Sequence, residues 1–258
     1  MTRDEHATDG PRFVATLREE RAARLKGGLY HLNQIRLAYN SNHIEGSQLT
    51  EEQTRFIYET RTIDGTAPVD DIIETVNHFR LFDAMIDDIG APLTADRLKD
   101  YHRILKAGTS DADRSWFALG GWKTRANTVG GQDTTPPEQV GDAIGALLAA
   151  VPESMTFEDI CDFHAAFEAI HPFQDGNGRV GRIVMFGQCL SAGLTPFIVL
   201  ESERLFYYRG LHEYADEPGY LRDTLRHFQD VYAQTYARYL PPVSVVGDGP
   251  SAGRSRRP

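Results

Sequence analysis

The sequence predicts a mainly α-helical fold with one small β element. Along most of the 258 residues, apolar side chains recur every three or four positions, the spacing that buries one face of an α-helix. Residues 115–131 depart from this spacing, because glycine pairs flank a short segment with mixed β signals. Such a segment is typical of a hairpin or an extended flap. The chain contains no internal repeat.

Helices before residue 150 are marked by their ends as well as by their apolar positions. Thr94 is the predicted N-cap of one helix, and Gly108 is its predicted stop. Thr135 followed by Pro136 predicts a second cap with proline in the first turn, opening a helix that runs to Ala150. The apolar positions with helical spacing run over residues 13–25, 29–44, 72–86 and 98–105.

A further helix is expected just before a glycine-rich stretch. Thr156, with Asp159 three residues later, forms a capping-box start. An apolar stripe then continues to about His171, and Pro172 ends the helix. The stripe consists of Phe157, Ile160, Phe163, Phe167 and Ile170.

Another helix is expected after the turn at residues 175–178, which reads Asp-Gly-Asn-Gly. It should run from about Arg179 to Leu190, and Gly193 should close it. From residue 203 to residue 239, aromatic and leucine side chains again recur at helical spacing. This pattern predicts a helical C-terminal region.

The overall charge argues against binding to nucleic acid or to anionic membranes. The formal net charge is −10 and the pI is near 5.4, so broad affinity for nucleic acid or an anionic membrane is not expected. No apolar stretch has the length of a membrane span, and the polar N-terminus lacks the apolar core of a signal peptide. We therefore expect a cytoplasmic protein. Cys161 and Cys189 lie in apolar helical patterns and are expected to be buried thiols.

The expected organisation is a single domain over residues 12–240. Residues 1–11 are charged and small, and residues 241–258 are rich in Pro, Gly, Ser and Arg. Neither end can bury enough apolar surface to offset the entropy of ordering it, so both are expected to be disordered. The tail is also too short to form a folded nucleic-acid reader.

Residues 171–182, HPFQDGNGRVGR, place several chemical groups around one turn. A glycine-rich turn that leads into a helix presents backbone N–H groups and the positive end of the helix dipole, which together bind phosphate. Arg179 and Arg182 share a helical face and can grip one polyphosphate. Asp175 is a hard oxygen ligand suited to Mg²⁺. His171, whose unperturbed pKa is about 6.5, can accept a proton near neutral pH.

Other interpretations fit this stretch less well. GNGRVG matches the dinucleotide fingerprint, but that fingerprint follows a strand in a βαβ unit, whereas a helix is expected here. A Walker loop would need Lys-Ser/Thr after the glycines. A zinc site made of His164, His171 and Asp175 lacks a compact ligand set. Taken singly, each residue could be a helix cap or part of an ordinary turn. Their occurrence together, in this order, favours a catalytic site.

At these residues the chain resembles the Fic family of protein adenylyltransferases, whose signature is H-x-F-x-[D/E]-G-N-G-R-x-x-R. Every specified position of the signature is present. The matching residues are His171, Phe173, Asp175, Gly176, Asn177, Gly178, Arg179 and Arg182. The resemblance implies a Fic-type helical bundle with a β-hairpin flap over about residues 12–240.

The resemblance also implies an enzyme that moves AMP from ATP to a hydroxyl side chain of a protein, with Mg²⁺ as cofactor. His171 would deprotonate the target hydroxyl, and Asp175 would hold Mg²⁺ on the α- and β-phosphates. Phe173 would anchor the loop, and pyrophosphate would leave. The residues that bind ATP phosphates would be Gly176, Asn177, Gly178, Arg179 and Arg182.

Two further segments resemble elements of the family. The segment 121–131 is similar to a flap that pairs with the backbone of the target by strand addition. The family often has arginine where Lys123 stands. Tyr207 and Tyr208 match a paired-tyrosine region near the adenine, and core aromatics on a helix explain them equally well. The docking residues of the flap would be Gly121, Trp122, Lys123, Asn127 and Val129.

Residues 41–46, SNHIEG, resemble the inhibitory motif [S/T]-x-x-x-E-[G/N] of the family, on a helix at about residues 30–46. Glu45 would pair with Arg182 in the place of the γ-phosphate, so that ATP would bind with its α-phosphate misaligned. We therefore expect an autoinhibited ground state. The structural alternative is a surface carboxylate before a helix-ending glycine. The matching positions are Ser41, Glu45 and Gly46.

The leading interpretation is thus a self-inhibited AMP transferase acting on a Ser, Thr or Tyr hydroxyl of a protein, the chain itself included. Two alternatives stay open: a de-AMPylase that uses the same site, with Glu45 positioning water, and a nucleotide-binding regulator without turnover. Relatives also include phosphocholine transferases and kinase-like variants; Gly178 argues against the latter, which have lysine there. An inhibitory motif in the same chain disfavours a toxin with a separate antitoxin. The target protein and a homo-oligomeric state cannot be read from the sequence.

Overall fold

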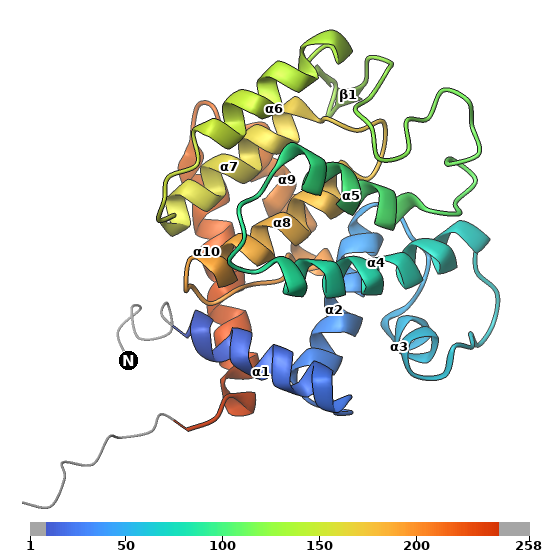
Figure 1. The fold of residues 1–258 in the computed structure, drawn as a ribbon, viewed down its shortest axis with the longest axis vertical. Helices are drawn as coiled ribbons and strands as arrows, with labels where there is room; N and C mark the ends of the chain where they lie inside the picture. The colour runs from blue at the N-terminus through green and yellow to red at the C-terminus, as the bar shows by residue number, and fades with distance from the viewer. Residues whose placement is uncertain (1–8, 243–258) are drawn as a thin grey trace, which may run out of the picture.

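The computed structural model describes residues 9–242, which form ten α-helices, three 3₁₀ helices and one two-stranded hairpin (Figure 1). The predicted mainly α fold with a small β element is confirmed. The α-helices are α1 (Gly10–Ala23), α2 (Leu29–Ile44), α3 (Glu51–Thr60), α4 (Val69–Asp88), α5 (Ala95–Lys106), α6 (Val140–Ala149), α7 (Phe157–Ile170), α8 (Asn177–Ser191), α9 (Arg204–His212) and α10 (Pro218–Tyr236). The strands are β1 (Thr128–Val129) and β2 (Gln132–Asp133), and the 3₁₀ helices are η1 (Pro137–Gln139), η2 (Glu201–Glu203) and η3 (Ala237–Tyr239).

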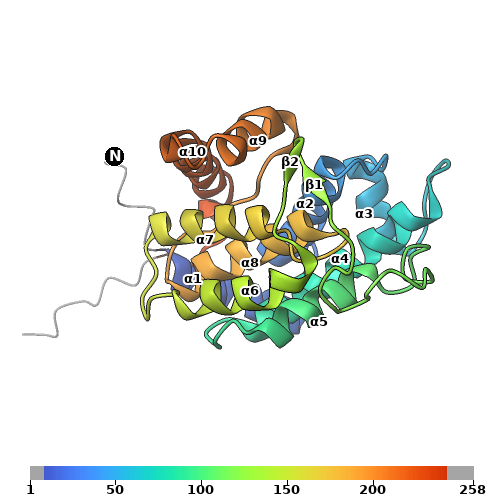
Figure 2. The same cartoon turned by 90° about the horizontal axis from the view of Figure 1, so that it is seen from above.

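Helix α8 runs through the middle of the molecule. It contacts α1, α2, α4, α5 and α7, and two perpendicular views place it among them (Figure 2). Two glycines let its neighbours approach: a Cβ at Gly181 would lie 2.4 Å from Glu168 of α7, and one at Gly187 would lie 3.0 Å from Met85 of α4. The apolar residues of α8 are buried on several sides, which explains why its sequence does not read as a simple amphipathic helix.

Two arginines are buried on this central helix. Arg179 and Arg182 are each 3% exposed. Because a buried charge is stable only when it is paired and hydrogen-bonded, both guanidinium groups must have partners from the helices packed around them. Those partners define the candidate site described below.

The helix starts predicted from threonine caps agree well with the structure. Thr94 accepts a hydrogen bond from the backbone N–H of Arg97 at the start of α5. Thr156 and Asp159 form the predicted capping box of α7. Helix α8 begins at Asn177, two residues before its predicted start, and Gly193 follows it with a φ of 75°. Cap chemistry is local, so the sequence alone can reveal it.

Several elements differ from the expectation. The helix expected after Thr135 begins instead as η1 and continues as α6, and Thr135 does not cap it. The C-terminal helical region is broken into α9 and α10 by residues 213–217. Helix α3 was not anticipated, because only Thr54 and Ile57 of its ten residues are buried and its apolar signal is weak. Helix α1 begins at Gly10, inside the segment expected to be disordered; the remaining expectations about the chain ends concern residues 1–8 and 243–258, outside the described residues.

The hairpin lies at the C-terminal side of the predicted flap. Thr128 pairs with Asp133 and Val129 pairs with Gln132. The two residues between the strands, Gly130 and Gly131, have φ values of 56° and 82°, a conformation that glycine adopts without strain and that suits a tight hairpin turn. The second strand, Gln132–Asp133, lies entirely after residue 131, where the predicted flap ended.

Cys161 and Cys189 are free and buried, as predicted. Burial raises the pKa of the Cys161 thiol to about 12, so this thiol stays protonated and behaves as a small apolar group. Within residues 9–242, none of the helices combines the length and the apolar character that crossing a membrane requires.

Candidate active site

The turn between α7 and α8 is held in one conformation by its own side chains. The amide of Asn177 closes the turn, because its Oδ1 accepts from the backbone N–H of Phe173 at 2.7 Å and its Nδ2 donates to the carbonyl of Phe173 at 2.8 Å. The ring of Phe173 is fully buried and stacks on His102 of α5 with centroids 4.2 Å apart. The ring of Phe173 therefore ties the turn to α5. Because the side-chain amide of Asn177 is hydrogen-bonded within the turn, only the backbone N–H of this residue would be available to a ligand.

His171 caps the C-terminal end of α7. Its φ of 52° is in the left-handed region, so the backbone turns sharply there and the imidazole is carried beside the start of α8. Nδ1 lies 3.3 Å from the carbonyl oxygen of Glu168, which assigns the ring proton of the neutral imidazole to Nδ1 and the lone pair to Nε2. Burial lowers the pKa of His171 below its usual value. The ring is therefore neutral near pH 7 and able to accept a proton.

Asp175 is one of three carboxylates in an ion cluster around two buried cations, Lys106 and Arg179. Its Oδ2 accepts from Nζ of Lys106 at 2.6 Å and from NH2 of Arg179 at 3.0 Å. Glu74 of α4 contacts the same two cations, and Asp111 lies 3.2 Å from Lys106. Burial alone would raise the pKa of Asp175, but Arg179 and Lys106 outweigh it and hold that pKa well below its usual range. Asp175 is thus fully ionised, as a magnesium ligand must be.

Arg182 is bound from the other side by α2. Its Nε donates to Oγ of Ser41 at 3.0 Å, and its NH2 donates both to the carbonyl of Ser41 at 2.9 Å and to Oε1 of Glu45 at 2.7 Å. A second carboxyl group, that of Glu168, is also near, but burial raises its pKa to about 8. Glu168 is therefore protonated at neutral pH, and Glu45 is the carboxylate that neutralises Arg182.

Glu45 also covers the start of α8. It follows the last residue of α2 as its C-cap, and a Cβ built on Gly178 would lie only 2.2 Å from its Oε1. The carboxylate therefore rests directly against the first turn of α8, where backbone N–H groups attract anions. Gly46 follows with a φ of 99°, a conformation that ends α2 immediately after Glu45.

The base of the predicted flap is fastened to the turn after α7. The backbone N–H of Lys123 donates to the carbonyl of Pro172 at 2.8 Å, and Nδ2 of Asn127 donates to the carbonyl of Phe173 at 3.1 Å. The ammonium of Lys123 is buried; it contacts Oδ1 of Asn127 at 2.7 Å and the carbonyl of Ile170 at 3.2 Å. Lys123 thus points into the protein, and of the predicted docking residues only Val129, 44% exposed, stands out on the surface.

The other two predicted docking residues of the flap, Gly121 and Trp122, are half-buried. Trp122 packs on the ring of Phe173 with centroids 5.3 Å apart, and Nζ of Lys99 lies 4.8 Å from its ring. Gly121 directly precedes it and donates its backbone N–H to the carbonyl of Ala118. Both residues therefore support the flap from its base.

The two adjacent tyrosines have different surroundings. Tyr207 is 1% exposed, and its hydroxyl lies 2.7 Å from Nε2 of His164, so its side chain belongs to the core. Tyr208 is 42% exposed and donates its hydroxyl to the carbonyl of Ile44, the last residue of α2, at 2.8 Å. Only Tyr208 has a ring face available to a ligand.

Two site residues, Glu74 and Lys106, were not anticipated from the sequence. Glu74 lies on α4 and Lys106, 2% exposed, is the last residue of α5. Both read as ordinary charged residues of amphipathic helices. Charge balance gives an indirect signal for Glu74 alone, because the buried Arg179 needs a carboxylate partner, whereas Lys106 adds a further cation.

The part of the chain that contains this site is similar to a known protein family. Residues 92–188 match the sequence model of the Fic/DOC family, a span that includes the whole of residues 171–182. Protein adenylyltransferase Fic of Drosophila erecta is 30% identical over 215 residues, which cover 78% of this chain and 41% of that protein. The protein of the same name from Nematostella vectensis is 25% identical over 217 residues, which cover 80% and 49%. The chain therefore spans less than half the length of these relatives.

Solved structures share the fold. A Fic family protein from Desulfovibrio desulfuricans G20 is 25% identical with a TM-score of 0.68, and the match covers 88% of this chain and 73% of that one. A Fic domain containing signaling protein from Bacteroides thetaiotaomicron VPI-5482 is 21% identical with a TM-score of 0.66, covering 88% and 93%. The helical arrangement around α8 is thus shared with Fic domains.

Proposed function

We propose, from the match of residues 92–188 to the Fic/DOC family model, that this chain transfers AMP from ATP to a hydroxyl group of a protein. The chain is a distant homologue of protein adenylyltransferases. The observation that carries the proposal is the gathering of three groups at the start of α8: a neutral His171, an ionised Asp175 and the buried Arg179. They are a proton acceptor, a metal ligand and a phosphate-binding cation. Attack at phosphorus needs such positioning and charge neutralisation more than covalent help.

ATP phosphates would bind at the first turn of α8. The backbone N–H groups of Gly176, Asn177 and Gly178 and the helix dipole favour an anion there. Arg179 reaches the same place from within the helix, and its present partners Glu74 and Asp175 hold its guanidinium in position. Because the fork of an arginine can bind two phosphate oxygens at once, Arg179 would fix the orientation of the polyphosphate.

Asp175 fits the role of the Mg²⁺ ligand. Its carboxylate is ionised and its side chain is 43% exposed, so one face remains open toward solvent. A magnesium ion can be held by one carboxylate together with the phosphates themselves, so Asp175 alone would be a sufficient protein ligand. When bound, the metal would neutralise charge on the α- and β-phosphates.

His171 would take the proton of the attacking hydroxyl. Its Nδ1 is engaged by the carbonyl of Glu168, so Nε2 is the accepting atom. As the hydroxyl oxygen forms its bond to the α-phosphorus, the bond between that phosphorus and the bridging oxygen breaks, and pyrophosphate leaves. The proton resides on His171 until it is released to solvent.

The exposed hairpin is the proposed docking edge for the target. Its base is fixed to the turn after α7 through Lys123 and Asn127, so a peptide that pairs with β1 would be held at a defined height above His171. Strand addition of this kind supplies affinity through backbone hydrogen bonds and places little demand on sequence. A peptide bound in this way would bring a Ser, Thr or Tyr hydroxyl to His171 with little dependence on the sequence around it.

Glu45 is the proposed inhibitor of this reaction. Its carboxylate occupies Arg182 and rests on Gly178, two places that a correctly seated triphosphate needs. With Glu45 in place, ATP would bind with its γ-phosphate displaced and its α-phosphate misaligned. Inhibition would be relieved by any change that lifts the C-terminal end of α2.

Removal of AMP from a modified protein is a second candidate, favoured by the same position of Glu45. A carboxylate beside the start of α8 could orient a water molecule toward the phosphorus of a bound AMP group. Glu45→Gln would then abolish release of AMP from a modified target. Under the leading proposal, the same substitution increases transfer.

The direct test uses the Glu45→Gly protein with ATP labelled at the α-phosphate, Mg²⁺ and a cell extract. Labelled protein bands, and AMP located on a Ser, Thr or Tyr residue by mass spectrometry, are the expected result. ATP consumption without labelled protein, or no labelling of any band by this variant, would contradict the proposal.

A further inference from the structure

A cavity of about 470 Å³ lies between the N-terminal half of α2 and the helices α3 and α4. Its walls include Tyr30 and Gln34 of α2, Tyr58 of α3 and Phe79 of α4. The loop between α1 and α2 closes one side. This cavity is separate from the start of α8, because Glu45 and the phosphate-binding turn do not line it. Its volume is within the range of sites for small organic molecules.

The rim of the cavity is rich in cations that lack a carboxylate. Arg24, Lys26, Arg61 and Arg80 line it. Within residues 9–242, none of these four has an ion pair, and the hydrogen bond of the Arg80 guanidinium goes to the neutral amide of Asn77. For a chain of net charge −10, four such cations around one hollow are a concentration of positive charge that attracts anions.

The two carboxylates of the cavity are already engaged. Glu59 lies 3.1 Å from Nε2 of His31 and 3.6 Å from Arg55. Asp83 accepts from the hydroxyl of Tyr30 and lies 3.5 Å from Arg21. Among the described residues, neither carboxylate forms an ion pair with the four rim cations.

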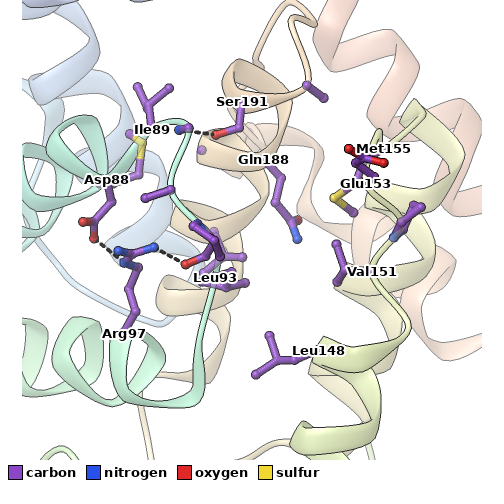
Figure 3. Close-up of a pocket in the computed structure, with 18 of the residues that line it drawn as sticks. Asp88, Ile89, Leu93, Arg97, Leu148, Val151, Glu153, Met155, Gln188 and Ser191 are labelled. Atoms are coloured by element: carbon purple, nitrogen blue, oxygen red, sulfur yellow. Dashed lines mark hydrogen bonds and ion pairs between the residues drawn. The ribbon is translucent and has the colours of Figure 1, made fainter.

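Another cavity of the molecule shows the contrast. It has a volume of about 510 Å³ and lies near the C-terminal end of α8. Its arginine is neutralised, because Arg97 pairs with Asp88 at 2.8 Å inside the lining (Figure 3), and Glu153 adds a negative charge. No comparable set of unpaired cations surrounds it among the described residues. Size alone does not distinguish the two cavities; the charge of the rim does.

The floor of the cationic cavity is polar as well. Gln34 is 1% exposed, and its Nε2 donates to the hydroxyl of Tyr30 and to the carbonyl of Phe79. Its Oε1 has no hydrogen-bond partner among the described residues. Because that oxygen is itself buried, it belongs to the packing beneath the cavity; the size of the cavity favours an organic anion over a bare inorganic ion.

We propose that this cavity binds a small organic polyanion, a polycarboxylate or a phosphorylated molecule, through Arg24, Lys26, Arg61 and Arg80. The site joins α2 to α3 and α4, at the end of α2 opposite Glu45. A bound anion would hold these helices together and stabilise the fold by mass action.

Two of the four cations can be removed with little risk to the fold. Arg24 and Arg61 are exposed helix C-caps in the left-handed region, with φ values of 51° and 60°. Asparagine tolerates this backbone conformation. The Arg24→Asn/Arg61→Asn double variant therefore removes two charges from the rim while keeping both caps.

The test is calorimetric titration of the full chain with citrate and, separately, with pyrophosphate, without Mg²⁺ and at low salt. At least one anion should bind the parent protein, and the double variant should bind it about tenfold or more weakly. Arg103→Gln/Arg209→Gln, which removes two charges that are 53% and 51% exposed elsewhere, should change the affinity by less than about twofold.

The two anions also separate the sources of the signal. Citrate binding alone identifies a carboxylate site, and pyrophosphate binding identifies a phosphate site. If the start of α8 also binds pyrophosphate, the double variant should lose one of two sites and keep the other. Absence of binding by both anions, or equal affinity in the parent and the Arg24→Asn/Arg61→Asn protein, would overturn the proposal and leave the proposed AMP transfer untouched.

Discussion

The carboxylate of Glu45 lies 2.7 Å from the guanidinium of Arg182, across 137 residues of sequence. The arginine is on the central helix and is 3% exposed, whereas the side chain of Glu45 is 28% exposed. The contact therefore joins a fixed cation to a carboxylate at the end of a helix that reaches the surface. Because a buried guanidinium needs a partner, this ion pair can open at little cost only when another anion, such as the γ-phosphate of ATP, replaces the carboxylate, which suits a reversible block.

Replacing Glu45 should release AMP transfer. Glu45→Gly frees Arg182 and uncovers Gly178, so the triphosphate can take its productive position. We expect the rate of label transfer from α-labelled ATP to rise about tenfold or more, since each 1.4 kcal/mol of lost competition is worth a factor of ten. Glu45→Gln, which removes only the charge, should give a smaller increase. An unchanged rate in both variants would remove the inhibitory assignment.

Arg182 should be needed even when the block is gone. In the Glu45→Gly/Arg182→Ala protein the competitor is absent, but so is the cation that would hold the γ-phosphate. We expect transfer to return to background levels while ATP still binds through Arg179. Scintillation counting of labelled protein and calorimetry with ATP check the two parts. Full activity of this double variant would show that the γ-phosphate lies elsewhere.

His171 should be required for the chemical step and for its pH dependence. His171→Ala should lower transfer about 10²- to 10⁴-fold, the usual contribution of a general base, with an unchanged circular dichroism spectrum. The matched control is His227→Ala, because His227 is a histidine on α10 that is 52% exposed. This variant should be as active as the parent.

The pH profile gives a second readout for the same residue. Burial lowers the pKa of His171, so the ring remains neutral as the pH falls below 6.5 and becomes protonated only at lower pH. The acid limb of the Glu45→Gly rate should therefore lie below pH 6.5. A limb above that value would assign the titration to another group.

The local part of this site was readable from the sequence. His171, Asp175, Arg179 and Arg182 lie within twelve residues, and the capping box of Thr156 fixes the helix that precedes them. Helix periods and cap chemistry act over a few residues, so their geometry follows from spacing. The partner of Arg182 came instead from the resemblance of residues 41–46 to the inhibitory motif of the Fic family, and the structure places Glu45 on Arg182.

The long-range part was not readable. Glu74 and Lys106 reach Asp175 only because α4 and α5 pack beside α8, and no spacing within one segment encodes that packing. Similarly, Tyr207 and Tyr208 are neighbours in sequence but face the core and the surface respectively. Which face of a helix is covered depends on elements far along the chain.

Lys106 should contribute to stability through this buried cluster. Lys106→Met keeps the length of the side chain but leaves Glu74 and Asp175 with one cation, Arg179, between them. The loss of a cation beside Glu74, which is 13% exposed, is costly, but solvent screens Asp175, which is 43% exposed; we expect the free energy of unfolding in urea at pH 7 to fall by about 2 kcal/mol. Lys99→Met, on the same helix, should cost less than about 1 kcal/mol.

The pH dependence of that loss separates charge from packing. Lys106 and Arg179 hold the pKa of Asp175 below its unfolded value, so this group adds stability above about pH 4 that is lost as the pH falls further. The difference between the parent and Lys106→Met should therefore be greatest at pH 7 and shrink below about pH 4, where the carboxylates are protonated in the variant. A difference that stayed constant down to pH 3 would mean that Lys106 acts through its aliphatic stem alone.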